Sequence, residues 1–144
     1  MEAALRLARA AAVRDEIPVG CVIVHEGETL AEACNETIQR QDPTAHAELL
    51  AIQRACGNGG AGRLREATMY VTLEPCAQCA GAIVLAKVAR VIYGAHDARW
   101  GMAGSVYDIL REPRLNHRPD VTGGFMEAEC AELLKRFFVP RRET

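Results

Sequence analysis

Apolar residues recur along this chain with two alternating periods, which predicts helices and strands that follow one another. Between residues 3 and 14, alanine and leucine fall at helical spacing, so this segment is predicted as a helix. Residues 19–24 form a continuous apolar run rich in β-branched side chains, typical of a buried strand. The turn at 26–28 and the apolar positions of 29–34 predict a second strand that pairs back as a hairpin.

The middle of the chain is predicted to alternate between helix and strand. Pro43 favours a helix start, and Asp42 or Thr44 can cap it, so a helix is predicted from about 45 to 56. Further elements are a strand at 67–73, a helix at 76–86, a strand at 88–95, a short helix at 105–111, a strand at 120–122 and an amphipathic helix at 126–139. Residues 96–101 and 113–118 are predicted as loops.

This alternation indicates a three-layer α/β/α sandwich around a five-stranded mixed sheet. No internal repeat or low-complexity linker interrupts it, so residues 1–144 are predicted to form one domain. The segment 57–62 matches the Gly-x-Gly-x-x-Gly spacing of dinucleotide-binding loops. That motif needs a strand before it and a helix after it, and the order here is reversed. We therefore interpret it as a helix stop and a flexible loop.

Composition places the chain among ordinary globular proteins: 49% of its 144 residues are hydrophobic and 25% charged. No apolar run approaches the roughly 20 residues that span a membrane. The net charge of −2 argues against general affinity for nucleic acid. Basic residues gather late in the chain, either as solvated helix ends or as a local phosphate-contacting patch. They are Arg111, Arg114, His117, Arg118, Lys135, Arg136, Arg141 and Arg142.

Six cysteines are present without the short secreted context of a disulfide framework. Cys21, Cys34, Cys56 and Cys130 lie in apolar stretches and are predicted to be buried small hydrophobes. A reducing cytoplasm fits this usage.

Two short blocks carry the candidate chemistry. His46 and Glu48 stand in the first block, and Cys76 and Cys79 in the second. Imidazole and thiolate are ligands that Zn²⁺ prefers, and cysteines at i and i+3 share one helix face. Three protein ligands leave a fourth position for water, as in catalytic zinc sites, and Glu48 is then available to move protons. A structural zinc clip or a redox cysteine pair is the alternative.

The spacing His-x-Glu followed by Pro-Cys-x-x-Cys is the signature of zinc nucleobase deaminases. Residues i and i+2 of an ideal helix point nearly opposite ways, so spacing alone does not bring Glu48 to the metal held by His46.

The chain resembles the bacterial tRNA-specific adenosine deaminases of the cytidine-deaminase-like superfamily over nearly its whole length. The resemblance rests on residues 17–20, Asn35, 42–48, 72–76, 79–82, 93–95, 104–105, 115–118 and 129–138. Gln78 departs from the family, which usually carries Met there, and Trp100 stands where a small or polar residue is usual. Both departures bear on substrate preference.

The resemblance implies one Zn²⁺ per chain on His46, Cys76 and Cys79, with Glu48 as the catalytic proton carrier. It implies hydrolytic conversion of adenosine to inosine at the wobble position of a tRNA anticodon stem-loop, in a cytoplasmic homodimer. Implied substrate contacts are Asn35, Ala47, Glu74, Asp97, Arg99, His117, Phe138, Arg141 and Arg142.

Several of these positions have a second interpretation. Asn35 can be a strand-end turn residue, and His117 can cap a loop. One of Phe137 and Phe138 is expected in the core.

Two rival functions also remain. A free guanine or cytosine deaminase would share the zinc chemistry, and a non-catalytic RNA-binding or partner subunit would share the fold. The aromatic and basic tail argues against the first rival, and the presence of Glu48 argues against the second.

Overall fold

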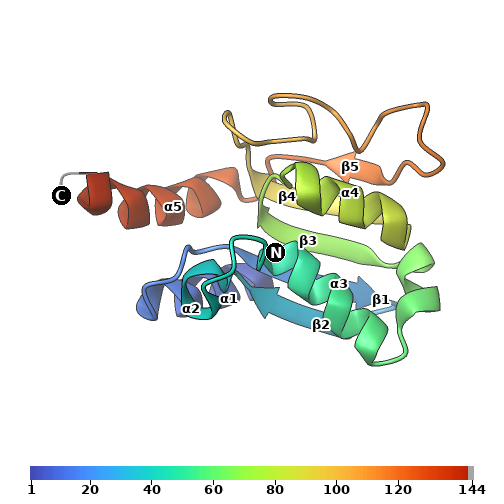
Figure 1. The fold of residues 1–144 in the computed structure, drawn as a ribbon, viewed down its shortest axis with the longest axis horizontal. Coiled ribbons are helices and arrows are strands. Elements are labelled where there is room, and N and C mark those ends of the chain that lie inside the picture. Colours follow the sequence, from blue (N-terminus) through green and yellow to red (C-terminus); the bar gives the residue numbers. More distant parts are fainter. Residues whose placement is uncertain (143–144) are drawn as a thin grey trace.

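The computed structural model describes residues 1–142, and its centre is a five-stranded sheet with helices on both faces (Figure 1). The first half contains α1 (Glu2–Val13), β1 (Gly20–His25), β2 (Glu28–Cys34), α2 (Thr37–Arg40), α3 (Ala47–Gly57) and η1 (Ala61–Glu66). The second half contains β3 (Thr68–Leu73), α4 (Ala77–Ala86), β4 (Arg90–Ala95), β5 (Asp120–Thr122) and α5 (Glu127–Arg142). The predicted α/β/α layering is confirmed.

The sheet is mixed, as predicted, with the strand order β2-β1-β3-β4-β5. β1 pairs antiparallel with β2 in the predicted hairpin and antiparallel with β3. β3, β4 and β5 run parallel to one another. The β3–β4 connection passes through α4, because parallel neighbours need a crossover. The β4–β5 connection, residues 96–119, instead runs as a long segment without a helix.

The helices divide between the two faces of the sheet. α3 and α4 pack together on one face, and α1 and α5 cover the other (Figure 1). Alanine dominates the contacts of α1, whose Ala4, Ala8 and Ala11 are fully buried. Gly20 permits this close approach, because a Cβ there would lie 2.0 Å from the carbonyl oxygen of Ala4.

The structure corrects three predictions made from the sequence. The helix predicted at 105–111 is wrong, because this segment forms turns. Its amides donate to carbonyl groups five to seven residues earlier, whereas an α-helix needs a separation of four. Val106 N donates to Gly101 O (2.9 Å) and Ile109 N to Met102 O (2.9 Å), which is no helical ladder. Part of the predicted loop at 57–62 belongs to the 3₁₀ helix η1. Cys56, predicted as buried, is exposed near the end of α3, whereas Cys21, Cys34 and Cys130 are buried as predicted.

The last helix also differs from its predicted bounds, since α5 continues through Pro140 to Arg142. Among residues 1–142, no helix combines the length and the apolar character needed to cross a membrane.

Candidate metal centre and active site

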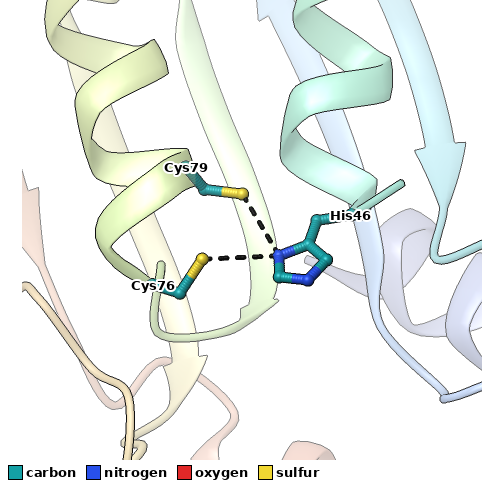
Figure 2. Close-up of side chains that lie close together, drawn as sticks. All are labelled: His46, Cys76 and Cys79. Atoms are coloured by element: carbon teal, nitrogen blue, oxygen red, sulfur yellow. Dashed lines mark hydrogen bonds between the residues drawn. The ribbon is translucent and has the colours of Figure 1, made fainter. Parts of the chain in front are cut away.

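Two helix N-termini bring the candidate metal ligands together. His46 is the N-cap residue of α3, and Cys76 is the N-cap residue of α4, with Cys79 one turn further on. Because α3 and α4 pack side by side, their first turns face each other, and Figure 2 shows the imidazole of His46 pointing at both sulfur atoms.

The distances in this group suit a tetrahedral zinc ion. His46 Nδ1 lies 3.4 Å from Cys76 Sγ and 3.6 Å from Cys79 Sγ. Bonds of about 2.0–2.1 Å to nitrogen and about 2.3 Å to sulfur, held at a tetrahedral angle, separate the two atoms by about 3.5 Å. Both distances from His46 therefore match a Zn²⁺ site, and the three side chains supply the donor set of a catalytic site with one position left for water.

The electrostatics of the two thiols also favour a cation. Their mutual hydrogen bond is the largest cause of the shift in each: it lowers the pKa of Cys76 to about 4 and raises the pKa of Cys79. The same neighbourhood raises the pKa of His46, chiefly through its hydrogen bond with Cys76. One thiolate forms readily here, and a second negative sulfur requires a positive ion to offset it.

Glu48 lies beside the three ligands and is buried, with 4% of its surface exposed. The charged neighbours of its carboxyl group are Cys76 and His46, and burial is the main cause that raises its pKa to about 7. This proximity resolves the objection from helix geometry. His46 has extended backbone angles (φ −79°, ψ 151°), so the i, i+2 divergence of a regular helix does not apply.

Glu74 anchors the loop that follows β4. Its buried carboxylate accepts hydrogen bonds from Asp97 N (3.1 Å), Ala103 N (2.9 Å), Ser105 N (3.1 Å) and the Ser105 hydroxyl. Burial alone would raise the pKa of Glu74, but these donors outweigh it and hold the pKa below its usual range. The side chain that the sequence marked only as a neighbour of the substrate therefore fixes residues 96–105 against the segment leading to Cys76.

Asp97 shapes that loop further. Its Oδ1 accepts hydrogen bonds from Arg99 N (3.0 Å) and Trp100 N (3.1 Å), which holds both residues in a tight turn. Arg99 and Trp100 are exposed, and 67% of the Trp100 surface is accessible.

Asn35 belongs to a buried network built on Glu16, a residue that the sequence analysis did not single out. Asn35 Nδ2 donates to Glu16 Oε1 (3.0 Å) and to Thr37 Oγ1 (2.9 Å). Glu16 also accepts from Ile38 N (3.1 Å) and Gln39 N (2.9 Å) at the start of α2. Burial would raise the pKa of Glu16, but these hydrogen bonds outweigh it and lower the pKa. No spacing rule reveals such a role, because the hydrogen-bond partners of Glu16 lie about 20 residues further along the chain.

The remaining candidates lie further along the chain and differ in their surroundings. His117 Nε2 donates to Val88 O (2.7 Å), so its ring braces the β4–β5 connection, as the loop-capping interpretation requires. Phe137 is the buried member of the aromatic pair, and Phe138 is partly exposed. Arg141 lies over the Phe137 ring (3.5 Å to its centroid) and pairs with Asp15 (3.1 Å). Arg142 is exposed at the end of α5. Ala47, the first residue of α3, is buried.

Comparisons with known proteins agree on one family. A family model of the cytidine and deoxycytidylate deaminase zinc-binding region matches residues 1–95. The chain is 44% identical over 138 residues to the tRNA-specific adenosine deaminase of Bacillus subtilis, covering 96% of this chain and 86% of that protein.

Solved structures support the same placement. A structure from studies of A-to-I editing by tRNA:A34 deaminases at the wobble position of transfer RNA superposes with a TM-score of 0.87. The two sequences are 46% identical, and the superposition covers 93% of this chain and 97% of the solved chain. The guanine deaminase from Nitrosomonas europaea shares the fold (TM-score 0.77) at 22% identity, covering 94% of this chain and 81% of that chain.

Proposed function

This chain belongs to the tRNA-specific adenosine deaminases of the cytidine and deoxycytidylate deaminase zinc-binding family, and we propose that it converts adenosine to inosine at the wobble position of a tRNA anticodon. The observation that carries the proposal is the zinc-fitting group of His46, Cys76 and Cys79 with buried Glu48 beside it. A structural clip would not require a carboxyl group at that point, and the third ligand is absent from a redox cysteine pair.

The reaction adds water at C6 of adenine and expels the exocyclic amine as ammonia. Zinc, when bound by His46, Cys76 and Cys79, supplies the Lewis acidity that lowers the pKa of a ligated water toward about 7. Glu48 accepts the proton that the water loses and delivers it to a ring nitrogen of the adenine. The amino group then takes the proton of the new C6 hydroxyl group as the C6–N bond breaks, so ammonia leaves and the C6 carbonyl of inosine remains. Burial suits Glu48 to this exchange, because a carboxyl group with a raised pKa both takes up and returns a proton readily.

The target base must leave the stack of the anticodon loop, which costs a few kcal/mol. We propose that surrounding residues offset this cost through contacts with the nucleoside, the flanking bases and the phosphates, with the backbone at Ala47 and around Glu74 contacting the base edge. The proposed contacts are Asn35, Ala47, Glu74, Asp97, Arg99, His117, Phe138, Arg141 and Arg142. The exposed turn of Asp97 to Trp100, fixed by Glu74, supports this assignment because it presents a cation and an indole ring to solvent.

The proposal includes a single domain, one zinc ion per chain, a cytoplasmic setting and a homodimer in which the partner borders each active site. Sedimentation equilibrium of the zinc-loaded protein measures the state directly, and a species of 15.7 kDa would exclude the dimer.

A turnover assay on an anticodon stem-loop with adenosine at the wobble position tests the function. Digested nucleosides are scored for inosine, and free adenosine, cytosine and guanine are tested in parallel. Inosine from the stem-loop alone is the expected result. Product from a free base alone would move the assignment to the metabolic deaminases, whose fold this chain shares.

The role of Glu48 is tested with Glu48→Ala and the near-isosteric Glu48→Gln. Removing a general acid–base group lowers kcat by roughly 10²–10⁴-fold. The kcat of both variants is therefore expected to be at least about 10²-fold below that of wild type. Zinc content, measured by atomic absorption, is expected to stay at the wild-type level, because Glu48 is not a ligand. Turnover above a tenth of the wild-type value with intact zinc would refute the proposed role.

A further inference from the structure

One hydrogen bond joins the two halves of the metal centre directly. Gln78 lies on the first turn of α4, between Cys76 and Cys79, and its Nε2 donates to the backbone carbonyl of Thr44 (2.9 Å). Thr44 precedes His46 by two residues. The bond therefore connects the segment that carries both cysteines to the segment that carries the histidine.

The receiving end of this bond is itself held in place. Thr44 O also accepts a hydrogen bond from His46 N (2.7 Å). Asp42 Oδ1 accepts bonds from Thr44 N (2.9 Å) and from the Thr44 hydroxyl (2.7 Å). An unbroken chain of hydrogen bonds thus runs from the His46 amide through the Thr44 carbonyl to Gln78.

The donating end is equally constrained. Gln78 stands one residue before Cys79, and its Nε2 also lies 3.9 Å from Cys79 Sγ. That distance is at the long end for a bond to sulfur, so the contact with Thr44 is the stronger of the two. No metal is required for either contact, since both are made by protein atoms alone.

We propose that Gln78 is a positioning residue that holds the zinc ligands of α3 and α4 at metal-binding separation before zinc arrives. A ligand set that is already in place loses less freedom on binding, which favours affinity and slows release. Groups outside the ligand set that orient the ligands commonly change metal affinity by about 10–100-fold. Gln78 bonds to the backbone beside a ligand and not to the ligand itself, so we expect an effect of no more than about tenfold.

The inference rests on the proposed zinc site but is independent of the substrate. It concerns metal retention, so it can hold even if the stem-loop assay fails, and it can fail while inosine is still produced.

The test is Gln78→Met, since methionine has a similar length and flexibility but no N–H to donate. Zinc-loaded protein is mixed with excess 4-(2-pyridylazo)resorcinol, and the absorbance of the zinc–dye complex gives the rate of release. Release is expected to be about three- to tenfold faster than from wild type, which is the range of one net hydrogen bond. Gln53→Met, the same change at an exposed position of α3, is the matched control and is expected to release zinc at the wild-type rate.

Thermal unfolding separates a role in the site from a role in the fold. The rise in Tm on zinc loading is expected to be smaller in Gln78→Met than in wild type, because losing the bond lowers the Tm of the zinc-loaded protein more than that of the chelated protein. A release rate within about 1.5-fold of wild type would overturn the proposal. So would an equal loss of Tm in the loaded and the chelated protein, because the bond would then stabilise the fold alone. Gln78→Ala, measured in the same way, provides the answer if the methionine variant does not fold.

Discussion

Replacing Glu74 with glutamine tests whether one buried carboxylate fixes the loop beside the active site. Four hydrogen bonds from Asp97, Ala103 and Ser105 converge on its two oxygens. Glutamine keeps one acceptor oxygen and turns an NH₂ group toward the other pair of donors. The Ser105 hydroxyl can accept from that NH₂ group, but at least one backbone N–H loses its acceptor, and the remaining bonds are no longer made to a charged group. Hydrogen bonds to a charged group contribute about 1.5–3 kcal/mol each, which gives a loss of about 3 kcal/mol in the free energy of unfolding.

That loss is large enough to measure by two routes. A chain of this length changes its Tm by roughly 2–4 °C per kcal/mol, so Glu74→Gln is expected to melt roughly 10 °C below wild type. Urea titration gives the same difference from the transition midpoint if the m-value is unchanged. Both proteins are compared at one fixed zinc concentration, because bound metal adds its own stability. The Michaelis constant for the stem-loop is expected to rise as the turn of Asp97 to Trp100 loses its anchor.

The matched control is Glu132→Gln on α5. Glu132 forms an exposed i, i+4 pair with Arg136 at 3.1 Å, and such pairs contribute about 0.3–0.5 kcal/mol. A loss below 1 kcal/mol in Glu74→Gln, or a loss equal to that of the control, would refute the reasoning. It would mean that the loop keeps its position without the carboxylate.

Two further predictions concern Glu16 and Trp100. The lowered pKa of Glu16 means that its stabilising effect is present above its unfolded-state pKa of about 4.3 and is lost as pH falls through the lower folded-state value. Glu16→Gln is therefore expected to melt below wild type at pH 7, and the gap should narrow below about pH 4.5; a gap independent of pH would contradict this. Trp100→Ala is expected to raise KM for the stem-loop about 5- to 150-fold with little change in kcat, because stacking on one base contributes about 1–3 kcal/mol. Tyr107→Ala, an equally exposed aromatic position of the same connection, is the control, and an unchanged KM in Trp100→Ala would remove the stacking role.

The metal ligands were predictable from the sequence because their chemistry is local. Cys76 and Cys79 reach one ion from a single helical turn, and residue type and spacing are sufficient to see this. The position of Glu48 beside the three ligand side chains was not predictable from spacing. It depends on the extended backbone of His46 at the start of α3, a property of a helix terminus that the helical repeat does not describe.

Features that depend on distant contacts could not be predicted. Residues 105–111 have the composition of a short helix, yet Glu74 and the backbone of residues 101 and 102 provide other hydrogen-bond partners, so turns form instead. The role of Gln78 could not be predicted for the same reason. Its departure from the usual methionine was visible in the sequence, but its partner, Thr44, lies 34 residues earlier in the chain.

The long β4–β5 connection has a consequence for how such an enzyme can be altered. It contributes no metal ligand, and it is held through Glu74 near its start, through the fully buried Leu110 in its middle and through the bond of His117 to Val88 near its end. The intervening residues 106–116 are mostly exposed. The exposed Arg99 and Trp100, which carry proposed RNA contacts, lie on this connection and not on the helices that hold the metal ligands, so RNA preference and hydrolysis are assigned to different parts of the chain. An engineer seeking a new editing target should therefore vary Arg99 and Trp100 first and leave the buried Glu74 and Leu110 untouched.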